Sequence, residues 1–452
     1  MTGRPSLAVI LAAGKGTRMN SALEKVLHPL GGTPMLGHVL SMAQEAGFDQ
    51  KTIVLGPGMD EVEAYCWDLD ASAKCIVQKK QNGTADAVLT ARKELEGFSG
   101  DVVVLYGDTP LLRADTVAKV GQALGQGADV VVLGFEARDP TGYGRLITNG
   151  DDRLLAIREE MDASSEERAI TLCNSGVFGF RGDVILQILD KIGSDNAKGE
   201  FYLTDAVEIA RGDGLQAVAV ACEEEEVLGI NTRVELARAE AAMQQRLRGL
   251  AMANGATLIA PETVYLSADT VMGKDVVLEP HIVLGPNVTL EDGVTVKAFS
   301  HLEGAYVKRG ASIGPFARLR PGAEIGEQAR IGNFVEVKNA VFAEGAKANH
   351  LAYVGDARVG KGANVGAGTI TCNYDGFEKH LTDIGAGAFI GSNSALVAPV
   401  RIGPGAYVGS GSVITKDVAQ DALAVTRAPQ QEREGWAAKV RARRTRKSGN
   451  KE

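Results

Sequence analysis

The feature that most constrains the fold of this chain is a six-residue repeat of aliphatic side chains in its C-terminal half. Near the end, six consecutive positions follow the repeat, which chance spacing of Val and Ile does not produce. A six-residue period is typical of a parallel β-helix, in which three hexads, roughly 18 residues, form one triangular coil. Each aliphatic side chain then stacks on the one in the next coil, at the spacing of neighbouring strands. The repeated positions are Val276, Ile282, Val288 and Val294; Ile313, Leu319, Ile325, Ile331 and Val337; Val359 and Val365; and Ile384, Ile390, Leu396, Ile402, Val408 and Ile414.

The N-terminal half has a different pattern. Short apolar runs alternate with longer helical patterns as far as about Ile230. Strands buried on both faces have this pattern, so it predicts βαβ units around a mostly parallel, Rossmann-like α/β sheet. The runs are Leu7–Leu11, Thr52–Leu55, Val102–Leu105, Val130–Leu133 and Val218–Ala221.

The stretch between the two halves is rich in Ala, Leu, Glu, Gln and Arg and contains no Pro, so we expect a long helix there, capped by Asn231 or Thr232. The expected organisation is an α/β domain over 1–230, a linker helix over 231–252, a parallel β-helix over 253–429 and a basic, flexible tail over 430–452. The cations of the tail favour a solvated segment over a nucleic-acid site.

Composition excludes several classes of protein. The formal net charge is −9 over 452 residues, so the chain lacks the excess of cations that broad nucleic-acid binding requires. No run of about 18 apolar residues is present, which argues against a membrane span. The N-terminus lacks the features of a signal peptide. Five scattered cysteines indicate neither a disulfide framework nor a zinc site, so we expect a reducing, cytoplasmic location.

A glycine-rich turn directly follows the first expected strand, with the sequence LAAGKGTRM from Leu11. Gly14 and Gly16 let backbone N–H groups approach a phosphate, and a helix after the turn would direct its positive end there. The spacing fits neither the P-loop nor the G-x-G-x-x-G dinucleotide pattern. Arg18, together with Lys25 in the following Lys-Val-Leu-His-Pro segment, adds two cations that suit a triphosphate.

A candidate metal ligand follows another expected strand. Tyr106-Gly107-Asp108 lies just after Val102–Leu105, at the carboxyl edge where ligands bind in open α/β sheets. Mg²⁺ prefers hard oxygen ligands combined with substrate phosphates, so Asp108 is a candidate for that role. A turn-forming Asp before Thr-Pro is the simpler interpretation, and it is the glycine-rich turn that favours the metal site.

The second candidate site interrupts the hexads. The segment Gly368–Gly376 contains Asn-Tyr-Asp-Gly in place of the apolar pattern, which predicts a loop extruded from a coil. Polar side chains gather in or beside residues 338–353 and 364–380. A lone histidine is more often structural than catalytic, so the residues alone leave the role of His350 open.

The order of the motifs resembles the family of bacterial bifunctional N-acetylglucosamine-1-phosphate uridylyltransferases/glucosamine-1-phosphate N-acetyltransferases, over nearly the whole chain. The matching segments are LAAGKGTRM, KVLH, QNGTADA, YGD, PTGYGR, CNSG and GINTR. The resemblance implies that Asp108 and Asn231 hold Mg²⁺ and that Arg18 and Lys25 act on the phosphates. It also implies binding of UTP and its product by Leu11, Ala12, Ala13, Gly14, Lys25 and Asn231, with the uracil read by Gln78, Gly83 and Thr84 and the amino sugar held by Gly144, Glu159 and Asn174.

The later segment Asn349–Tyr353 resembles the part of the family that carries a catalytic histidine. His350 would then take the proton of the amine as it attacks the thioester, and Glu336 would orient His350 or the amine. Glucosamine-1-phosphate would be bound by Arg320, Lys338, Tyr353 and Asn364, whose cations suit a phosphate. Acetyl-CoA would be contacted by Asn373, Tyr374, Lys379, Ser392, Ser410 and Arg427, with Lys379 also facing the sugar phosphate.

By this resemblance the chain is a bifunctional enzyme. Acetyl-CoA acetylates glucosamine-1-phosphate in the later domain, and UTP then reacts with N-acetylglucosamine-1-phosphate in the first. The resemblance also implies left-handed coils and a homotrimer. Two alternatives remain open on the sequence: a single-function sugar nucleotidyltransferase whose β-helix only oligomerises, and a guanine-nucleotide-exchange or regulatory subunit that kept both folds but lost catalysis.

Overall fold

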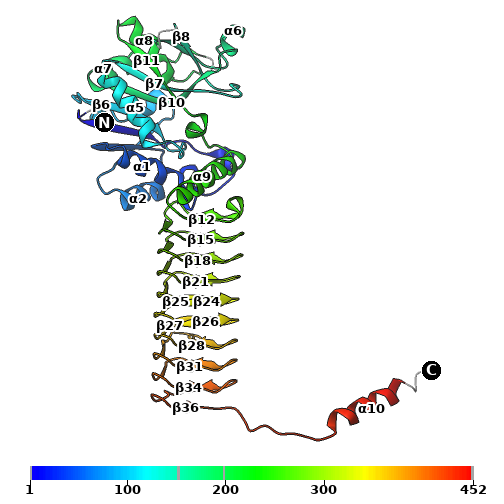
Figure 1. Ribbon diagram of the computed structural model, residues 1–452. Coiled ribbons are helices and arrows are strands. Elements are labelled where there is room, and N and C mark those ends of the chain that lie inside the picture. The colour runs from blue at the N-terminus through cyan, green and yellow to red at the C-terminus, as the bar shows by residue number, and fades with distance from the viewer. Residues whose placement is uncertain (1–2, 150–152, 197–198, 449–452) are drawn as a thin grey trace. The chain divides into compact units, whose positions relative to one another are not determined.

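The computed structural model describes residues 3–149, 153–196 and 199–448 (Figure 1). It divides into two compact units. The first contains Met1–Ala251 and Tyr265–Asp269, and the second contains Met252–Val264 and Thr270–Glu452. The first unit is an α/β sheet covered by helices, and the second is a stack of short parallel strands.

The central sheet of the first unit confirms all five predicted strands. Along the main order of the sheet, neighbouring strands are parallel, except that one inserted strand runs antiparallel to both of its neighbours. The order across the sheet is β11 (Ala217–Cys222), β7 (Val130–Glu136), β10 (Leu172–Arg181), β6 (Asp101–Tyr106), β1 (Ser6–Leu11), β4 (Gln50–Leu55) and β5 (Lys74–Val77). The antiparallel strand β10 was not predicted, because Asn, Ser and Gly break its apolar run and its register shifts between Asn174 and Phe178.

Helices cover both faces of this sheet, since alternate residues of each strand face opposite sides. In β1, Leu7 and Val9 belong to one apolar core, and Ala8 and Ile10 belong to the other. The first core also contains residues of α3 (Thr84–Leu89), α4 (Arg92–Leu95), α7 (Gly182–Leu189) and α8 (Ala206–Gly212). The second core is closed by α1 (Met35–Glu45), α2 (Asp60–Leu69) and α5 (Ala114–Gly125).

The predicted linker helix is α9 (Arg233–Ala253), and Thr232 caps it. The Glu235 carboxylate accepts hydrogen bonds from the backbone N–H groups of Asn231 and Thr232, at 2.7 and 2.8 Å, which completes a capping arrangement. Met243 packs into a small core with Leu30. The other elements of this unit are β2 (Pro29–Leu30), β3 (Thr33–Pro34), β8 (Arg145–Thr148), β9 (Leu154–Arg158), α6 (Ser165–Arg168), β13 (Tyr265–Leu266) and the short 3₁₀ helices η1 (Thr17–Met19), η2 (Lys25–Leu27), η3 (Leu203–Asp205) and η4 (Glu224–Val227).

The second unit consists of stacked coils of short parallel strands, as the hexads predicted (Figure 1). It also contains the 3₁₀ helix η5 (Pro261–Thr263). One sheet contains β12 (Thr257–Leu258), β15 (Val277–Leu278), β18 (Thr295–Val296), β21 (Ser312–Ile313), β24 (Arg330–Asn333), β26 (Lys347–His350), β28 (Asn364–Val365), β31 (Phe389–Ile390), β34 (Tyr407–Val408) and β36 (Leu423–Ala424). The other sheet contains β14 (Val271–Met272), β16 (Val283–Leu284), β17 (Thr289–Leu290), β19 (His301–Leu302), β20 (Ala305–Val307), β22 (Arg318–Leu319), β23 (Ala323–Ile325), β25 (Glu336–Phe342), β27 (Tyr353–Val359), β29 (Ile370–Cys372), β30 (Thr382–Ile384), β32 (Ala395–Val397), β33 (Val400–Ile402) and β35 (Val413–Ile414).

Two residues of each hexad point into the coil. All of the predicted repeat positions are buried, but in the first coils their neighbours two residues later, such as Leu278 after Val276, are buried as well. The ladder aligns Ile313 with Val296 and not with Val294. The predicted run from Val276 to Val294 therefore occupies the other inward position of each hexad. In later coils this position is filled by Ala, as at Ala311. Both positions are aliphatic at the start, so the period alone could not separate them.

The pairing interval locates the extruded loop. Partners in most of the ladder are 17 or 18 residues apart, as for Lys347 and Asn364. The interval lengthens to 25 between Ala357 and Thr382. The added residues form the predicted loop, which is closed by an antiparallel bridge between Tyr374 and Lys379.

The tail differs from its prediction. A flexible segment was expected over 430–452, whereas residues Trp436–Ser448 form helix α10. Ala, Lys and Arg favour helix, and this local preference was outweighed in the prediction by the charge of the segment. Among the described residues, no helix has the length and apolar character needed to cross a membrane.

Candidate active sites

A cavity of about 450 Å³ opens in the first unit, at the carboxyl ends of β1 and β6. This edge is where the strand order of open α/β sheets places ligands. Eleven of the residues predicted to bind nucleotide, sugar or metal line it: Leu11, Ala12, Ala13, Gly14, Lys25, Gln78, Gly83, Thr84, Asp108, Glu159 and Asn174. The structure therefore gathers most of the candidates of the first site around one space.

The glycine turn has the expected backbone but not the expected helix. Gly16 has φ of 59°, and a Cβ added there would lie 2.6 Å from Lys25 Cβ, so only glycine lets the turn pack against that lysine. The turn is followed by the 3₁₀ helices η1 and η2 rather than by an α-helix, which corrects the prediction of a helix directed at the phosphate. Arg18 is exposed on η1 and does not line the cavity.

Lys25, Asp108 and Asn231 form a polar centre in this site. The Lys25 ammonium donates to Asp108 Oδ2, and it also donates to Asn231 Oδ1 at 3.1 Å. Both partners of the ion pair are largely buried. Asn231 does not line the cavity itself, although the resemblance assigned it to the metal and the nucleotide. Two oxygen atoms from distant parts of the chain thus converge on one cation.

His28, in the same segment as Lys25, ties this centre to α9. Arg233 donates from its guanidinium to His28 Nδ1 at 3.2 Å, and to the carbonyl oxygen of Met19 at 3.2 Å. Burial lowers the pKa of His28, and the nearby charge of Arg233 lowers it further. A neutral imidazole is the form that can accept from a guanidinium. The start of α9 therefore holds both ends of the segment that carries Lys25.

The residues predicted to hold the amino sugar, Gly144, Glu159 and Asn174, lie next to one another. The backbone N–H of Asn174 donates to the Gly144 carbonyl at 2.8 Å, and a Cβ on Gly144 would lie 3.4 Å from Glu159 Oε1. Gly144 does not line the cavity, but it lies directly behind two residues that do. Thr204 donates to Glu159 Oε1 at 3.3 Å and lines the same wall.

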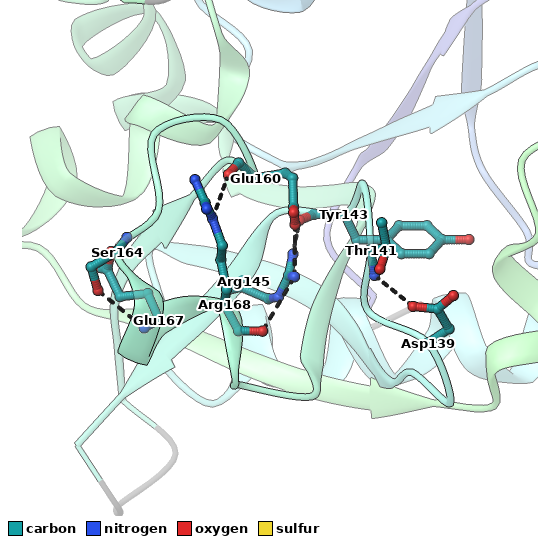
Figure 2. A network of polar contacts seen from close by, with 8 residues as sticks. All are labelled: Asp139, Thr141, Tyr143, Arg145, Glu160, Ser164, Glu167 and Arg168. Atoms are coloured by element: carbon teal, nitrogen blue, oxygen red, sulfur yellow. Dashed lines mark hydrogen bonds and ion pairs between the residues drawn. The ribbon is translucent and has the colours of Figure 1, made fainter.

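A buried arginine organises the backbone beside these sugar candidates (Figure 2). Arg145 is 1% exposed, and its guanidinium donates to Glu160 Oε2 at 2.7 Å and to the carbonyl oxygens of Tyr143 and Arg168. The hydrogen bond from Arg145 lowers the pKa of the Glu160 carboxyl. Tyr143 precedes Gly144 and Glu160 follows Glu159. Arg145 therefore fixes the chain on both sides of the predicted sugar contacts.

Sequence reasoning missed several residues of this cavity. Gln81 donates to the carbonyl of Ala13, and it stands within the motif QNGTADA that was quoted as a whole. Tyr106, which stands in the motif YGD, also lines the cavity, and burial raises its pKa. The segment Glu200–Thr204 gave no signal, because it reaches the cavity only through a tertiary contact: Phe201 N–H donates to the Asn82 carbonyl at 2.8 Å. The remaining unpredicted lining residues are Val26, Ala87, Phe178, Glu200, Tyr202, Leu203 and Thr204.

In the second unit, three cations predicted to face phosphate lie together. Lys338 is within hydrogen-bonding reach of Lys379, and this contact, with the charge of Arg320, lowers the pKa of Lys338. Arg320 also donates to Glu336 at 2.9 Å. Like charges repel, so such a cluster suits an anion that neutralises it. Glu336 was proposed as a partner of His350 or of the amine; in the structure it pairs with Arg320.

His350 has a partner that the sequence analysis did not name. Its Nδ1 lies 2.6 Å from Asn333 Oδ1, in the neighbouring coil. With an acceptor at that distance Nδ1 carries the proton, so Nε2 keeps a lone pair that can accept one. The ladder pairs Asn333 with His350, so a spacing of 17 residues was the signal that could have found it.

The extruded loop is stiffened by its own hydrogen bonds. Asp375 accepts from the backbone of Phe377 and Glu378, each at 2.8 Å, and from His380 Nε2 at 2.8 Å. These bonds lower the pKa of Asp375, the Glu378 contact most. At the base of the loop, Asn373 donates to Asp356 in the preceding coil. Tyr374 is exposed at the rim.

Three of the candidates for acetyl-CoA, Ser392, Ser410 and Arg427, form a column in successive coils. Gly411 N–H donates to the Ser392 carbonyl at 2.8 Å, and the Arg427 guanidinium donates to the Ser410 carbonyl. Arg427 thus reaches back over one coil to the position of Ser410. This column would allow a long, extended ligand to run along the coils.

One chain does not bring all candidates of the second site together. Lys338 and Tyr353 belong to the sheet of β25 and β27, whereas His350 and Asn364 belong to the other sheet, on β26 and β28. Tyr353 lies beside Glu336 in the ladder. The predicted site is therefore divided between two faces of the coil.

Comparisons with known proteins match both halves. A family model for MobA-like NTP transferase domains matches residues 8–170, and one for bacterial transferase hexapeptide repeats matches residues 382–416. A protein of Azorhizobium caulinodans, called "Bifunctional protein GlmU", is 60% identical over 98% of this chain and 99% of its own. A protein with the same name from Xanthobacter autotrophicus is 57% identical over 99% of this chain and 100% of its own. Another from Parvibaculum lavamentivorans is also 57% identical, over 98% of each chain.

The hexapeptide match and the parallel strands together identify the second unit as a left-handed parallel β-helix. The NTP transferase match covers the glycine turn, the cavity-lining residues up to Glu159 and the network of Figure 2. Identity at this level over the full length confirms the resemblance given by the motifs. The chain belongs to the bifunctional GlmU family, whose members join a uridylyltransferase to an acetyltransferase.

Proposed function

We propose that the two reactions of this bifunctional enzyme of UDP-N-acetylglucosamine biosynthesis take place at the two sites described above. Acetyl-CoA acetylates glucosamine-1-phosphate in the β-helix, and N-acetylglucosamine-1-phosphate then reacts with UTP in the α/β unit and releases pyrophosphate. One observation carries the assignment of sites: each unit gathers its own charged centre, Lys25 with Asp108 in the first and Lys338 beside Lys379 in the second.

At the first site the reacting oxygen belongs to a phosphate and is already an anion. The step therefore needs alignment and neutralisation of charge rather than a strong base. The oxygen attacks the α-phosphorus of UTP while the bond to the pyrophosphate oxygen breaks. Lys25 neutralises phosphate charge from the cavity wall, and the exposed Arg18 is free to fold over the outer phosphates. Glu159 and Asn174 hold the sugar.

Asp108 and Asn231 fit a magnesium ion. Their oxygens already converge on the Lys25 ammonium, which supports the proposal of a cation site at this point. Mg²⁺ takes one or two carboxylates and fills its other positions with water and phosphate oxygens. No group of three His, Cys, Asp or Glu side chains suited to a metal occurs in the part of the chain that is described. When bound, the ion would neutralise phosphate charge.

At the second site His350 acts as the general base. Asn333 holds the Nδ1 proton, so Nε2 accepts the proton that the amine of glucosamine-1-phosphate loses. The nitrogen forms a bond to the thioester carbonyl carbon, the C–S bond breaks, and coenzyme A leaves as its thiolate. Lys338 and Arg320 bind the sugar phosphate, and Ser392, with the column that includes Ser410 and Arg427, contacts the coenzyme.

The division of the second site between two faces supports a homotrimer. A neighbouring copy of the β-helix would bring the face with His350 and Asn364 against the face with Lys338 and Tyr353. We also place the enzyme in the cytoplasm, where UTP and acetyl-CoA are available. Its partners would be these substrates and other copies of the chain.

The test incubates the protein with glucosamine-1-phosphate, acetyl-CoA, UTP and Mg²⁺, and identifies products by mass. Wild-type protein should release coenzyme A, pyrophosphate and UDP-N-acetylglucosamine. His350→Ala should abolish acetyl transfer and leave uridylyl transfer from added N-acetylglucosamine-1-phosphate intact. Acetylation by that variant would contradict the proposed base, and formation of neither product by wild-type protein would refute the whole proposal.

A further inference from the structure

Gln78 is held by a residue that lies outside the cavity. Its side chain is 4% exposed and lines the nucleotide end of the cavity. Its backbone N–H donates to the Leu55 carbonyl at 2.8 Å, which fixes the start of the side chain. The amide Nε2 then donates to Asp86 Oδ2 at 2.8 Å. Asp86 is in the first turn of α3 and does not line the cavity.

The chemistry of Asp86 determines how the amide is turned. An ionised carboxylate has no proton to donate, so the atom of Gln78 that faces it must be the NH₂ group and not the oxygen. The carboxylate is itself held in place, because the Asn82 backbone N–H also points at Oδ2, at 3.5 Å. Since an amide is planar, one N–H directed at Asp86 fixes the side on which Gln78 Oε1 lies.

The orientation of this amide matters because uracil and cytosine differ in the same pair of atoms. Uracil presents an N3–H donor beside the O4 acceptor, whereas cytosine presents an N3 acceptor beside an N4–H donor. An amide with its oxygen facing position 3 and its N–H facing position 4 matches uracil. Rotation of the same amide by 180° would match cytosine instead.

We propose that Asp86 is a positioning residue that makes the nucleotide site selective for uracil over cytosine, by fixing the orientation of the Gln78 amide. This inference rests on the proposed function, in which Gln78 reads the base of UTP. Asp86 touches no substrate and acts only through Gln78. It therefore sets selectivity, while the strength of nucleotide binding comes from the other residues of the cavity.

Asp86→Asn is the sharpest perturbation, because it keeps the size of the side chain. An asparagine can accept from Gln78 Nε2 through its oxygen, and it can equally donate to Gln78 Oε1 through its NH₂ group. Both orientations of Gln78 are then supported. The ratio of kcat/KM for UTP to that for CTP should fall by about tenfold or more, as expected when a base-reading pair loses its fixed direction.

A double variant separates positioning from a structural role. In Gln78→Ala the amide is gone, so adding Asp86→Asn should leave the UTP:CTP ratio unchanged. The matched control is Asp115→Asn, which removes another carboxylate from a first helical turn, that of α5, away from the cavity. Its ratio should equal that of the wild type. Acetyl transfer, measured in each preparation, reports whether the β-helix remains folded, and a melting curve reports on the α/β unit.

Each outcome decides the matter. A fall in the ratio for Asp86→Asn that disappears in the Gln78→Ala background supports the inference. Equal losses for UTP and CTP, or an additive effect in the double variant, would overturn it while leaving the uridylyl site in place. If Asp86→Asn unfolds, Asp86→Ser, whose hydroxyl can also donate or accept, supplies the same comparison. Failure of the proposed function would look different, because Gln78→Ala would then leave the kinetics with UTP unchanged.

Discussion

Two adjacent residues of β31 offer a direct test of the coil. Ile390 is completely buried and lies between Val365 and Val408 in the ladder, whereas Phe389 points outward and is 41% exposed. Ile390→Ala should destabilise the local coil by about 2–5 kcal/mol, the usual cost of emptying a fully packed position. Phe389→Ala removes a larger side chain but loses only its stacking on Tyr407, at 5.2 Å between ring centroids, worth about 0.5–1.5 kcal/mol.

Hydrogen exchange of backbone amides, followed by mass spectrometry, measures this cost where it arises. A change of about 2–5 kcal/mol corresponds to exchange faster by about 30-fold to several thousandfold. In a solenoid each coil contacts only its neighbours, so the increase should be confined to β28, β31 and β34 and the coils beside them. The amides of β1 and β6, in the other unit, provide the internal control.

Ile390→Ala should accelerate exchange more than Phe389→Ala, although side-chain size alone would predict the opposite order. If Phe389→Ala accelerated exchange as much as Ile390→Ala, the inward and outward assignment of the hexad would be wrong. No acceleration in Ile390→Ala would contradict the stacked core itself. Acetyl transfer should weaken only in the variant whose coil opens, because Ser392 follows Ile390 by two residues.

Three further predictions concern the sites. Asp108→Ala should lower uridylyl transfer by about a hundredfold or more and leave acetyl transfer nearly intact, as measured in separate assays of the two reactions. Equal loss of both activities would contradict separate sites. In the proposed site Lys338 binds phosphate as its ammonium form, and Lys379 lowers its pKa, so the KM for glucosamine-1-phosphate should rise with pH below the ordinary lysine range of about 10.4. Lys338→Met should raise that KM about tenfold and flatten its dependence on pH. An unchanged pH profile would contradict the cation cluster. A lysine at position 145 cannot form the forked contacts of Figure 2, so Arg145→Lys should raise the KM for N-acetylglucosamine-1-phosphate about tenfold and leave the KM for UTP unchanged. The control is Arg181→Lys, because Arg181 pairs with carboxylates at the far end of β10, and this variant should change neither KM.

Local patterns explain how much of the fold was predictable. The five apolar runs were confirmed as strands because burial on both faces leaves a continuous signature in a few residues. Strand β10 was missed because Asn-Ser-Gly interrupts its apolar run where the register shifts, which no short-range pattern separates from a loop. The tail helix α10 was missed because charge was weighed above helix preference.

The candidate sites divide in the same way. Motifs located Lys25, Asp108 and Asn231, but their convergence joins residues up to 206 positions apart and depends on how the sheet and α9 are assembled. The partner of His350 was predictable only with the length of a coil in hand, since Asn333 lies one turn away. Glu336 was expected to orient His350 or the attacking amine, whereas in the structure its carboxylate accepts a hydrogen bond from the Arg320 guanidinium.

By itself, the sequence determined that there are two kinds of unit, where most strands and the connecting helix lie, and to which family the chemistry belongs, because periodicity and short motifs are encoded within a few neighbouring residues. Only the tertiary structure decided which polar atoms meet: Asp86 with Gln78, Arg145 with Glu160, Lys338 with Lys379. Such contacts depend on strand register, coil length and helix placement. These are properties of the packed chain as a whole, and no local stretch of residues specifies them.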